Sequence, residues 1–296
     1  MEKIIPRSLI KHLEWVPGQA FPQPAPTPVP LPTRVTRFSI DDILKGKTFF
    51  SDKKDSNNNW IGLPIALREA LQYAGQAGIV ATMPELIAAK LKADENHDFW
   101  KQWYTVHTEE NIGIDAKGRF YTANEPVLVI VNGGGILTSN RIEQAYAEGL
   151  INNSAKFRHE EFDKLLDGTL PDKSTIALYR IEEIKKGISN LPHQFGVVMP
   201  YALAQQTKSG YHKKDAFLEN PLVIARAGGV EHLEAYFDRA KDSDGDVGNH
   251  HPFASRDASI PQGRLLFLYD NYNGLYGYYY LISGGRFVGV APEAHP

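Results

Sequence analysis

The side chains best suited to chemistry gather in one short stretch near the C-terminal end of the chain. Residues 238–257 read DRAKDSDGDVGNHHPFASRD and hold five aspartates, one asparagine and two adjacent histidines. Three of the aspartates alternate in the D-x-D-x-D spacing of calcium loops, which lets a tight turn present several oxygens to one hard cation. The candidate ligands for a divalent metal ion, calcium or a transition metal, are Asp242, Asp244, Asp246 and Asn249.

The same stretch supports other interpretations. Val247 and Phe253 stand where an EF-hand needs glycine and a bidentate acid, so that pattern is incomplete. Imidazole suits zinc, iron, nickel or copper better than calcium. Without a metal, an imidazole oriented by Asp246 or Asp257 is a candidate general base. A solvated turn is the third interpretation, because Asp, Ser, Gly and Asn are ordinary turn formers. The candidate catalytic residues are His250, His251 and Asp257.

A glycine turn offers a second candidate site. It follows the apolar run Val127–Val131, which is typical of a buried central strand, and precedes a helix expected over residues 140–150. Such a turn exposes free N–H groups that bind anions. No Walker lysine follows, and Thr138 stands at the third glycine of the dinucleotide fingerprint, so a simple tight turn is the alternative. The candidate cofactor- or anion-binding residues are Gly133, Gly134, Gly135 and Arg141.

A tyrosine run forms the third candidate. Six tyrosines lie between Tyr269 and Tyr280. Alternate residues of a strand share one face, so half of these rings are expected on one side of a sheet. Such a face binds sugars, bases or protein partners through stacking and hydroxyl contacts. The alternative is a sheet that uses tyrosine for its strand propensity.

The elements that must position these residues indicate a mixed α+β or α/β fold. The pattern predicts a helical N-terminal half and a sheet-containing C-terminal half that ends in an antiparallel meander. Helices are expected after the caps Ser39 and Thr82, around Pro64–Tyr73, from Asn96 through Tyr104, and over Val230–Ala240. Expected strands are Thr175–Tyr179, Gly196–Met199, Leu222–Ala225 and, in the meander, Arg264–Tyr269, Tyr276–Ile282 and Arg286–Val290.

A proline-rich segment precedes these elements. Residues 17–33 hold seven prolines, and every second residue from Pro22 to Pro32 is proline. Proline fixes φ and disfavours helix in the residue before it, so the segment is expected to be extended. We therefore predict an N-terminal arm over residues 1–35 and one compact unit over residues 36–296, with a boundary near residues 111–120 as the alternative. The arm is interpreted as a stiff spacer or as a link between subunits of a homo-oligomer.

The composition excludes several classes of protein. The net charge of −3 argues against bulk binding to nucleic acid, which leaves a basic footprint. The absence of cysteine excludes disulfides, thiolate catalysis and cysteine-ligated metals. No apolar run approaches the ~20 residues of a membrane span, so no membrane association is expected. The N-terminus lacks a secretory signal pattern, and the expected location is the cytoplasm.

Two function classes stay open at this point, and the sequence leaves undecided whether the protein is an enzyme. The preferred hypothesis is a non-catalytic assembly or binding protein with a proline-rich arm and a tyrosine-rich contact sheet. The alternative is a divalent-metal-assisted hydrolase that uses the Asp/His stretch 238–257 to activate water.

Overall fold

The computed structural model describes residues 38–253, 256–270, 274–277 and 281–292. These residues belong to one compact unit, Arg34–Pro296. The predicted arm over residues 1–35 lies outside the described residues, so it stays a prediction, as does the alternative boundary near residues 111–120.

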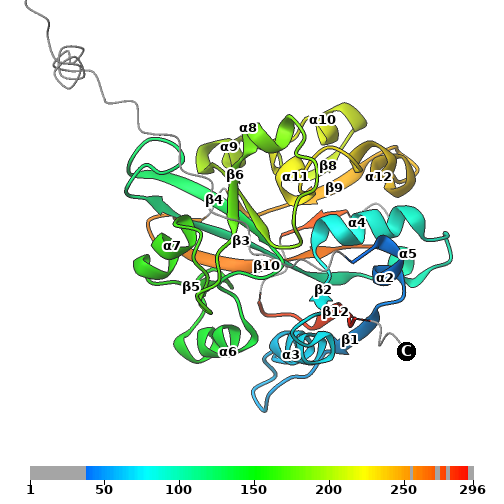
Figure 1. The fold of residues 1–296 in the computed structure, drawn as a ribbon, viewed down its shortest axis with the longest axis horizontal. Helices are drawn as coiled ribbons and strands as arrows, with labels where there is room; N and C mark the ends of the chain where they lie inside the picture. The colour runs from blue at the N-terminus through cyan, green and yellow to red at the C-terminus, as the bar shows by residue number, and fades with distance from the viewer. Residues whose placement is uncertain (1–37, 254–255, 271–273, 278–280, 293–296) are drawn as a thin grey trace, which may run out of the picture. The chain divides into compact units, whose positions relative to one another are not determined.

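A large mixed sheet runs through the unit (Figure 1). Among the described residues it has nine strands in the order β6-β7-β4-β3-β10-β11-β9-β8, with β5 paired to β10. Most neighbours are antiparallel, but β6 pairs with β7 and β9 with β11 in parallel. The strands are β3 (Tyr104–Asp115), β4 (Glu125–Asn132), β5 (Ala155–Lys156), β6 (Ala177–Arg180), β7 (Phe195–Pro200), β8 (Gly210–His212), β9 (Val247–His250), β10 (Gln262–Leu268) and β11 (Leu275–Tyr276).

A second sheet joins segments from the two ends of the described chain. Its order is β1-β12-β2, with β1 (Lys47–Ser51), β2 (Ile79–Val80) and β12 (Gly285–Val290). Both pairings are antiparallel, and Lys47 lies opposite Gly289. Helix α3 (Gly62–Ala74) packs on β1 and β12. The small sheet is therefore formed by segments far apart in the sequence.

Helices cover both faces of the large sheet. In Figure 1, α8 to α12 lie on one side of it and α6 and α7 on the other. Besides α3, the described helices are α2 (Ile40–Leu44), α4 (Met83–Lys92), α5 (Asp98–Lys101), α6 (Ser139–Glu148), α7 (His159–Leu166), α8 (Ile181–Lys185), α9 (Tyr201–Gln206), α10 (Lys214–Leu218), α11 (Pro221–Arg226) and α12 (Leu233–Ala240). None of them is long and apolar enough to cross a membrane.

The central strand β4 explains why both faces are covered. Leu128 and Ile130 belong to one apolar core, whereas Val127, Val129 and Val131 belong to the other. Successive side chains of a strand point to opposite faces, so a continuous apolar run needs packing on both sides. This prediction of a buried central strand is confirmed.

Local signals placed several helices correctly. The Ser39 side chain accepts the Asp42 N–H at the start of α2, and Thr82 forms a capping box with Glu85 at the start of α4. Thr138 caps α6, as expected. Helix α3 ends at Gly75, whose φ of 64° suits glycine. The mixed α and β class is confirmed.

Three expectations on elements were wrong. Leu222–Ala225 is not a strand but part of α11, because the Asn220 side chain accepts the N–H groups of Leu222 and Val223 and Pro221 fits the first turn. The predicted helix from Asn96 is only the single turn α5, and Tyr104 begins β3. The N-terminal half also contains strands β1 and β2.

The C-terminal meander needs correction as well. β10 and β11 pair antiparallel, as expected for the first turn of a meander. β11, however, pairs next with β9, and β12 pairs with β1 and β2 in the other sheet. Residues 278–280 of the expected strand Tyr276–Ile282 lie outside the described residues. Apolar alternation predicts a strand but not its neighbour, which explains the difference.

Candidate binding surface

Four rings form a row across one end of the large sheet. We call Tyr211, His250, Tyr276 and Tyr269 the aromatic row. Their ring centroids lie 5.2 Å apart from Tyr211 to His250, 4.8 Å from His250 to Tyr276, and 4.8 Å from Tyr276 to Tyr269. Aromatic pairs at this spacing contribute about 0.5–1.5 kcal/mol each beyond the area they bury. The row is therefore a connected surface rather than a set of separate side chains.

The strand register produces the row. Tyr276 of β11 lies opposite His250 of β9, and β8 pairs with β9 on the other side and carries Tyr211. Tyr269 directly follows β10, and its N–H donates to the Gly274 carbonyl at 3.0 Å. Tyr211 is 43% exposed, and the other three rings are half-buried. Tyr211 is therefore the most exposed ring of the row, whereas Tyr269 and Tyr276 also pack against an apolar core.

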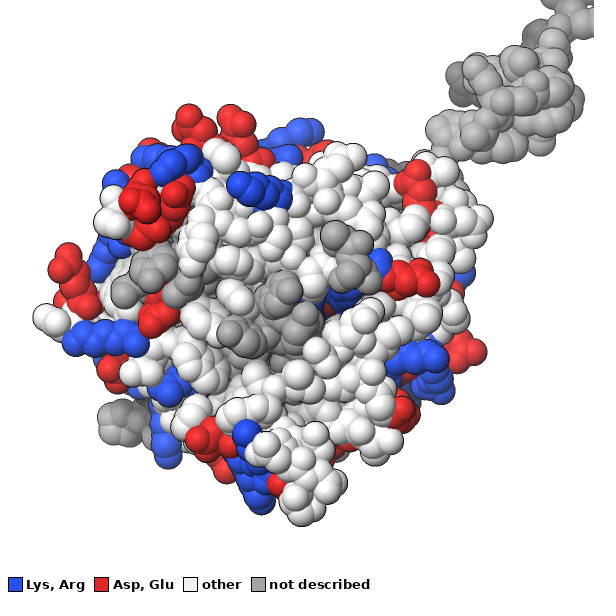
Figure 2. Space-filling view, turned by 180° about the vertical axis from the view of Figure 1, so that it is seen from behind, with Lys and Arg blue, Asp and Glu red and all other residues white. Residues whose placement is uncertain are grey.

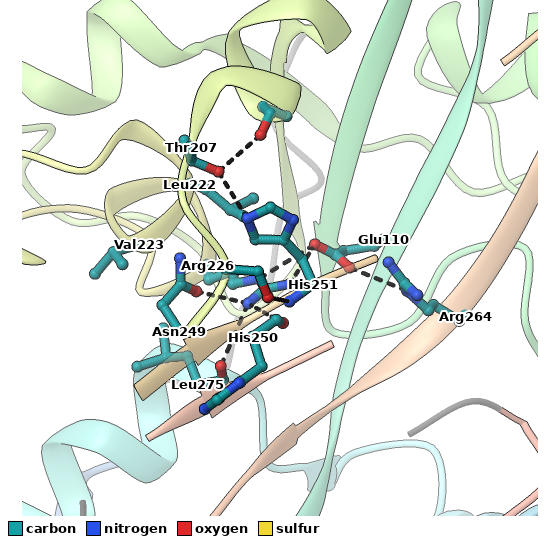
Figure 3. A network of polar contacts seen from close by, with 12 residues as sticks. Glu110, Thr207, Leu222, Val223, Arg226, Asn249, His250, His251, Arg264 and Leu275 are labelled. Atoms are coloured by element: carbon teal, nitrogen blue, oxygen red, sulfur yellow. Dashed lines mark hydrogen bonds and ion pairs between the residues drawn. The ribbon is translucent and has the colours of Figure 1, made fainter. Parts of the chain in front are cut away.

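A buried arginine holds the strands beneath the row (Figure 3). Arg226 of α11 is fully buried, and its Nη1 donates to the Asn249 side-chain oxygen at 2.6 Å. The same nitrogen donates to the carbonyls of His250 at 3.1 Å and Leu275 at 3.3 Å. One guanidinium group therefore fixes the backbone of both β9 and β11.

Glu110 of β3 balances that charge. Its Oε1 accepts from Arg226 Nη2 at 2.8 Å, and its Oε2 accepts from Arg264 Nε at 3.2 Å. All three side chains are fully buried. Burial by itself raises the pKa of the Glu110 carboxyl, but the two guanidinium groups outweigh it and hold that pKa below its ordinary value. Glu110 is therefore ionised at neutral pH.

The two adjacent histidines point to opposite sides of β9, as an extended segment requires. His250 lies in the row, whereas His251 is buried, stacks on Phe253 at 4.8 Å and has its Nε2 2.9 Å from Thr207 Oγ1. Burial, with Arg226 nearby, lowers the pKa of His251 to about 4. Burial and Arg226 also lower the pKa of His250. Both imidazoles are therefore neutral at pH 7.

The remaining residues of the Asp/His stretch are engaged in local contacts. Asp257 is exposed and accepts the Ser259 N–H at 2.8 Å. Asp242 Oδ1 accepts the N–H groups of Asp244 and Asp246, both at 2.9 Å. Asp246 pairs with Lys213 at 3.0 Å. Within the described ranges, no three His, Cys, Asp or Glu side chains form a group that could hold a metal ion. The structure thus does not bring the predicted metal and catalytic residues together.

The glycine turn binds a carboxyl side chain of its own chain. The N–H groups of Ile136 and Leu137 donate to the two oxygens of the Glu109 carboxyl group at 2.7 and 2.8 Å. The amides of Gly133 and Gly134 both donate to the His107 carbonyl instead. The turn therefore has the geometry expected of an anion site, with Glu109 as the group it holds.

The other predicted anion ligands are also placed by the structure. Gly133 and Gly134 have φ values of 79° and 90°, so the turn needs glycine there. A Cβ on Gly135 would meet the Glu109 carboxyl carbon at 2.6 Å. Arg141 of α6 pairs with Glu161 at 3.2 Å and also donates to the Lys156 carbonyl. Arg141 therefore faces away from the glycine turn, toward α7.

Sequence reasoning missed the support network of Glu110, Arg226 and Arg264. Glu110 and Arg226 are 116 residues apart in the chain. A local signal was the adjacent glutamate pair, Glu109 and Glu110, which the structure places inside the buried strand β3. Because buried charges need partners, that pair indicates cations elsewhere without naming them.

The surface charge is mixed on the face seen in Figure 2. Side chains in the middle of that face are mostly uncharged, and Lys and Arg lie beside Asp and Glu toward its edge. Among the described residues drawn there, neither sign forms a broad patch. This distribution gives no support to binding of a polyanion on that face.

Comparison with known proteins gives a similar fold. No protein-family model matches the chain, and no curated protein matches it. A solved structure described as "Accommodation of massive sequence variation in Nanoarchaeota by the C-type lectin fold" is 26% identical in sequence, with a TM-score of 0.61. The match covers 83% of this chain and 97% of that chain. The chain is therefore similar in fold to a C-type lectin fold.

Proposed function

We propose that this protein is a non-catalytic binding protein that contacts its partner through the aromatic row. The observation that carries the proposal is the unbroken contact of four partly or fully exposed rings at one end of the sheet, at centroid distances of 5.2, 4.8 and 4.8 Å. Tyrosine and histidine rings offer a large apolar area together with a polar tip, and tyrosine is enriched at protein interfaces for that reason.

The partner class we propose is a protein surface. Tyrosine supplies much contact area with few rotatable bonds, so little side-chain entropy is lost when a partner binds. Arg226 fixes the strands under the row through the carbonyls of His250 and Leu275. A contact face whose backbone is already ordered needs less reorganisation on binding.

The similar structure suggests how such a face can vary. It is described as accommodating massive sequence variation by the C-type lectin fold. In this chain the Arg226 contacts at 3.1 and 3.3 Å reach backbone carbonyls, which do not depend on the side chains above them. We propose that residues of the aromatic row can be exchanged to change the partner while the support network keeps the fold.

A displayed peptide library panned on the immobilised protein tests this proposal. The test protein carries Tyr211→Ala and Tyr276→Ala, and the control carries Tyr73→Ala. Tyr73 lies on α3 and is 43% exposed, the same fraction as Tyr211. Peptides selected on the wild type should bind the control as tightly as the wild type. They should bind the double variant about tenfold more weakly or worse, because the loss of a central ring costs about 1–2 kcal/mol or more of binding free energy. Equal binding to all three proteins would contradict the proposal.

The other hypotheses fare differently. The metal-assisted hydrolase draws no support from the contacts of Asp242 and Asp246, whose oxygens engage backbone amides and Lys213. The homo-oligomer formed through the arm stays a prediction, because residues 1–35 lie outside the described residues.

A further inference from the structure

Lys90 is a lysine whose whole side chain is buried. It lies on α4, and its exposed fraction is 0%. Lysine is almost never fully buried unless it is paired, because taking an ammonium group out of water is costly. A buried lysine therefore needs a specific hydrogen-bond partner, and the partner of Lys90 is a residue of the aromatic row.

The Lys90 amine reaches the end of β10. Its Nζ donates to the backbone carbonyl oxygen of Tyr269, and the ring of Tyr269 is the last ring of the aromatic row. The same Nζ lies 4.9 Å from the Trp100 ring centroid, and the Trp100 indole N–H donates to the Lys90 carbonyl at 2.8 Å. Helix α4 and Trp100 thus hold the amine in place under Tyr269.

The charged and titratable groups around the amine come from two other elements. Asp270 follows β10 and favours the protonated amine. From α12, the Arg239 guanidinium lies 4.7 Å from the Trp100 ring, and the buried Tyr236 ring stacks on Trp100 at 6.2 Å. Burial lowers the pKa of Lys90 to about 7, although Asp270 opposes the shift. The amine therefore changes its charge in the neutral pH range.

We propose that Lys90 is the positioning residue for the Tyr269 end of the aromatic row and that protonation of its amine releases that end. A neutral amine still donates a hydrogen bond to Tyr269 and suits the dry site. A charged amine is disfavoured there, so it shifts the Tyr269–Asp270 segment toward conformations that admit water. The row is then complete above the transition and loosened below it.

Amide exchange measured by NMR tests the release without any partner. The Tyr269 N–H donates to Gly274 and the Gly277 N–H donates to His250, so both amides report closure of this segment. For a closed-state pKa of about 7 and a solvated amine near its ordinary 10.5, opening should be about tenfold greater at pH 6 than at pH 8, after correction for intrinsic exchange. Carbon-labelled lysine spectra should show one lysine that titrates near pH 7.

Three variants separate a positioning role from a merely structural one. Lys90→Met is neutral at every pH but cannot donate to the Tyr269 carbonyl. Both amides should therefore be less protected than in the wild type at pH 8, and their protection should not change with pH. Lys90→Arg is always charged and should leave them open throughout. Lys92→Met is the control, because Lys92 is exposed on the same helix and pairs with Asp41; it should behave as the wild type. Titration of every lysine near 10.5, or unchanged pH dependence in Lys90→Met, would overturn the proposal.

The effect on partner binding rests on the function proposed above, and its test is separable. A peptide selected on the wild type at pH 8 should bind about tenfold more weakly at pH 6, and this difference should vanish in Lys90→Met. If the amides open but binding is indifferent to pH, the row is not the contact face while the positioning role stands. If the amides do not open, the positioning role fails whatever binds.

Discussion

Replacing Glu110 with glutamine should be among the most destabilising conservative changes in this protein. The change keeps the shape of the side chain and removes its negative charge. Glu110 is fully buried and accepts from Arg226 at 2.8 and 3.2 Å and from Arg264 at 3.2 Å. Removing one partner of a buried ionic group leaves uncompensated charge and costs about 3–5 kcal/mol. That is a large part of the ~5–15 kcal/mol that stabilises a typical domain.

Glu109→Gln is the matched control. Glu109 is the preceding residue of the same strand and is equally buried, but its partners are neutral: the N–H groups of Ile136 and Leu137 and the Asn111 side chain. Its loss should cost about 1–3 kcal/mol, the range for a buried polar group that loses partners. The difference between the two losses in free energy of unfolding measures the cost of leaving the charges of Arg226 and Arg264 without a buried counter-ion.

The pH dependence of the two glutamates should also have opposite signs. The arginines lower the folded-state pKa of Glu110, so its contribution is complete above the ordinary value of 4.5 and is lost as the pH falls below it. Burial raises the folded-state pKa of Glu109, so its contribution is greatest at low pH and is lost as the pH rises through that value. Glu110→Gln should therefore flatten the acid side of the stability curve.

Urea unfolding followed by circular dichroism from about pH 3 to pH 8 measures both effects. The free energy of unfolding should fall more in Glu110→Gln than in Glu109→Gln at pH 7, with similar slopes against urea. Equal losses of unfolding free energy in the two variants, or a loss below about 1 kcal/mol for Glu110→Gln, would refute the view that this ion network stabilises the sheet.

Three further changes test other parts of the structure. Gly277→Ala should lower the melting temperature strongly, because a Cβ there would meet Glu110 Oε2 at 2.8 Å inside a packed network; a melting curve like that of the wild type would count against this packing. The wild-type free energy of unfolding should rise from pH 7 to pH 9 by up to about 1.4 kcal/mol per unit, because Lys90 has a lower pKa folded than unfolded, and this rise should be absent in Lys90→Met. Chelator should leave the melting temperature unchanged, since Asp242 already accepts two backbone N–H groups; a drop that one metal ion reverses would restore the metal hypothesis.

The parts of the fold that the sequence predicted are those set by local chemistry. Three helices begin with side-chain contacts that span at most three residues, made by Ser39, Thr82 and Thr138. An unbroken apolar run predicts the buried strand β4. Leu222–Ala225 was predicted as a strand because a short apolar run suits helix or strand equally. Asn220 and Pro221 are a local helix-start signal of the same kind as Ser39, and that signal was overlooked.

The candidate site was predictable only in part. The tyrosine run indicated an aromatic face, and Tyr269 and Tyr276 do lie in the row. Tyr211 joins it only because β8 pairs with β9, and β9 with β11, over long separations in the chain. The alternation of apolar and polar residues predicts a strand but not which strands lie next to it. The spacing of residues in the sequence therefore could not predict the aromatic row or the position of Arg226 below it.

The pairing of β1 with β12 has a consequence for how this protein is made. Lys47 meets Gly289, so nearly the whole described chain must be synthesised before the small sheet exists. Closing so long a loop is entropically slow, and contacts of this kind delay folding. During synthesis, β1 and the apolar side of α3 would stay exposed to other nascent chains until β12 emerges from the ribosome and packs on them. The protein should therefore depend on chaperones more during synthesis than its finished stability suggests, and its yield in cells should respond to translation speed.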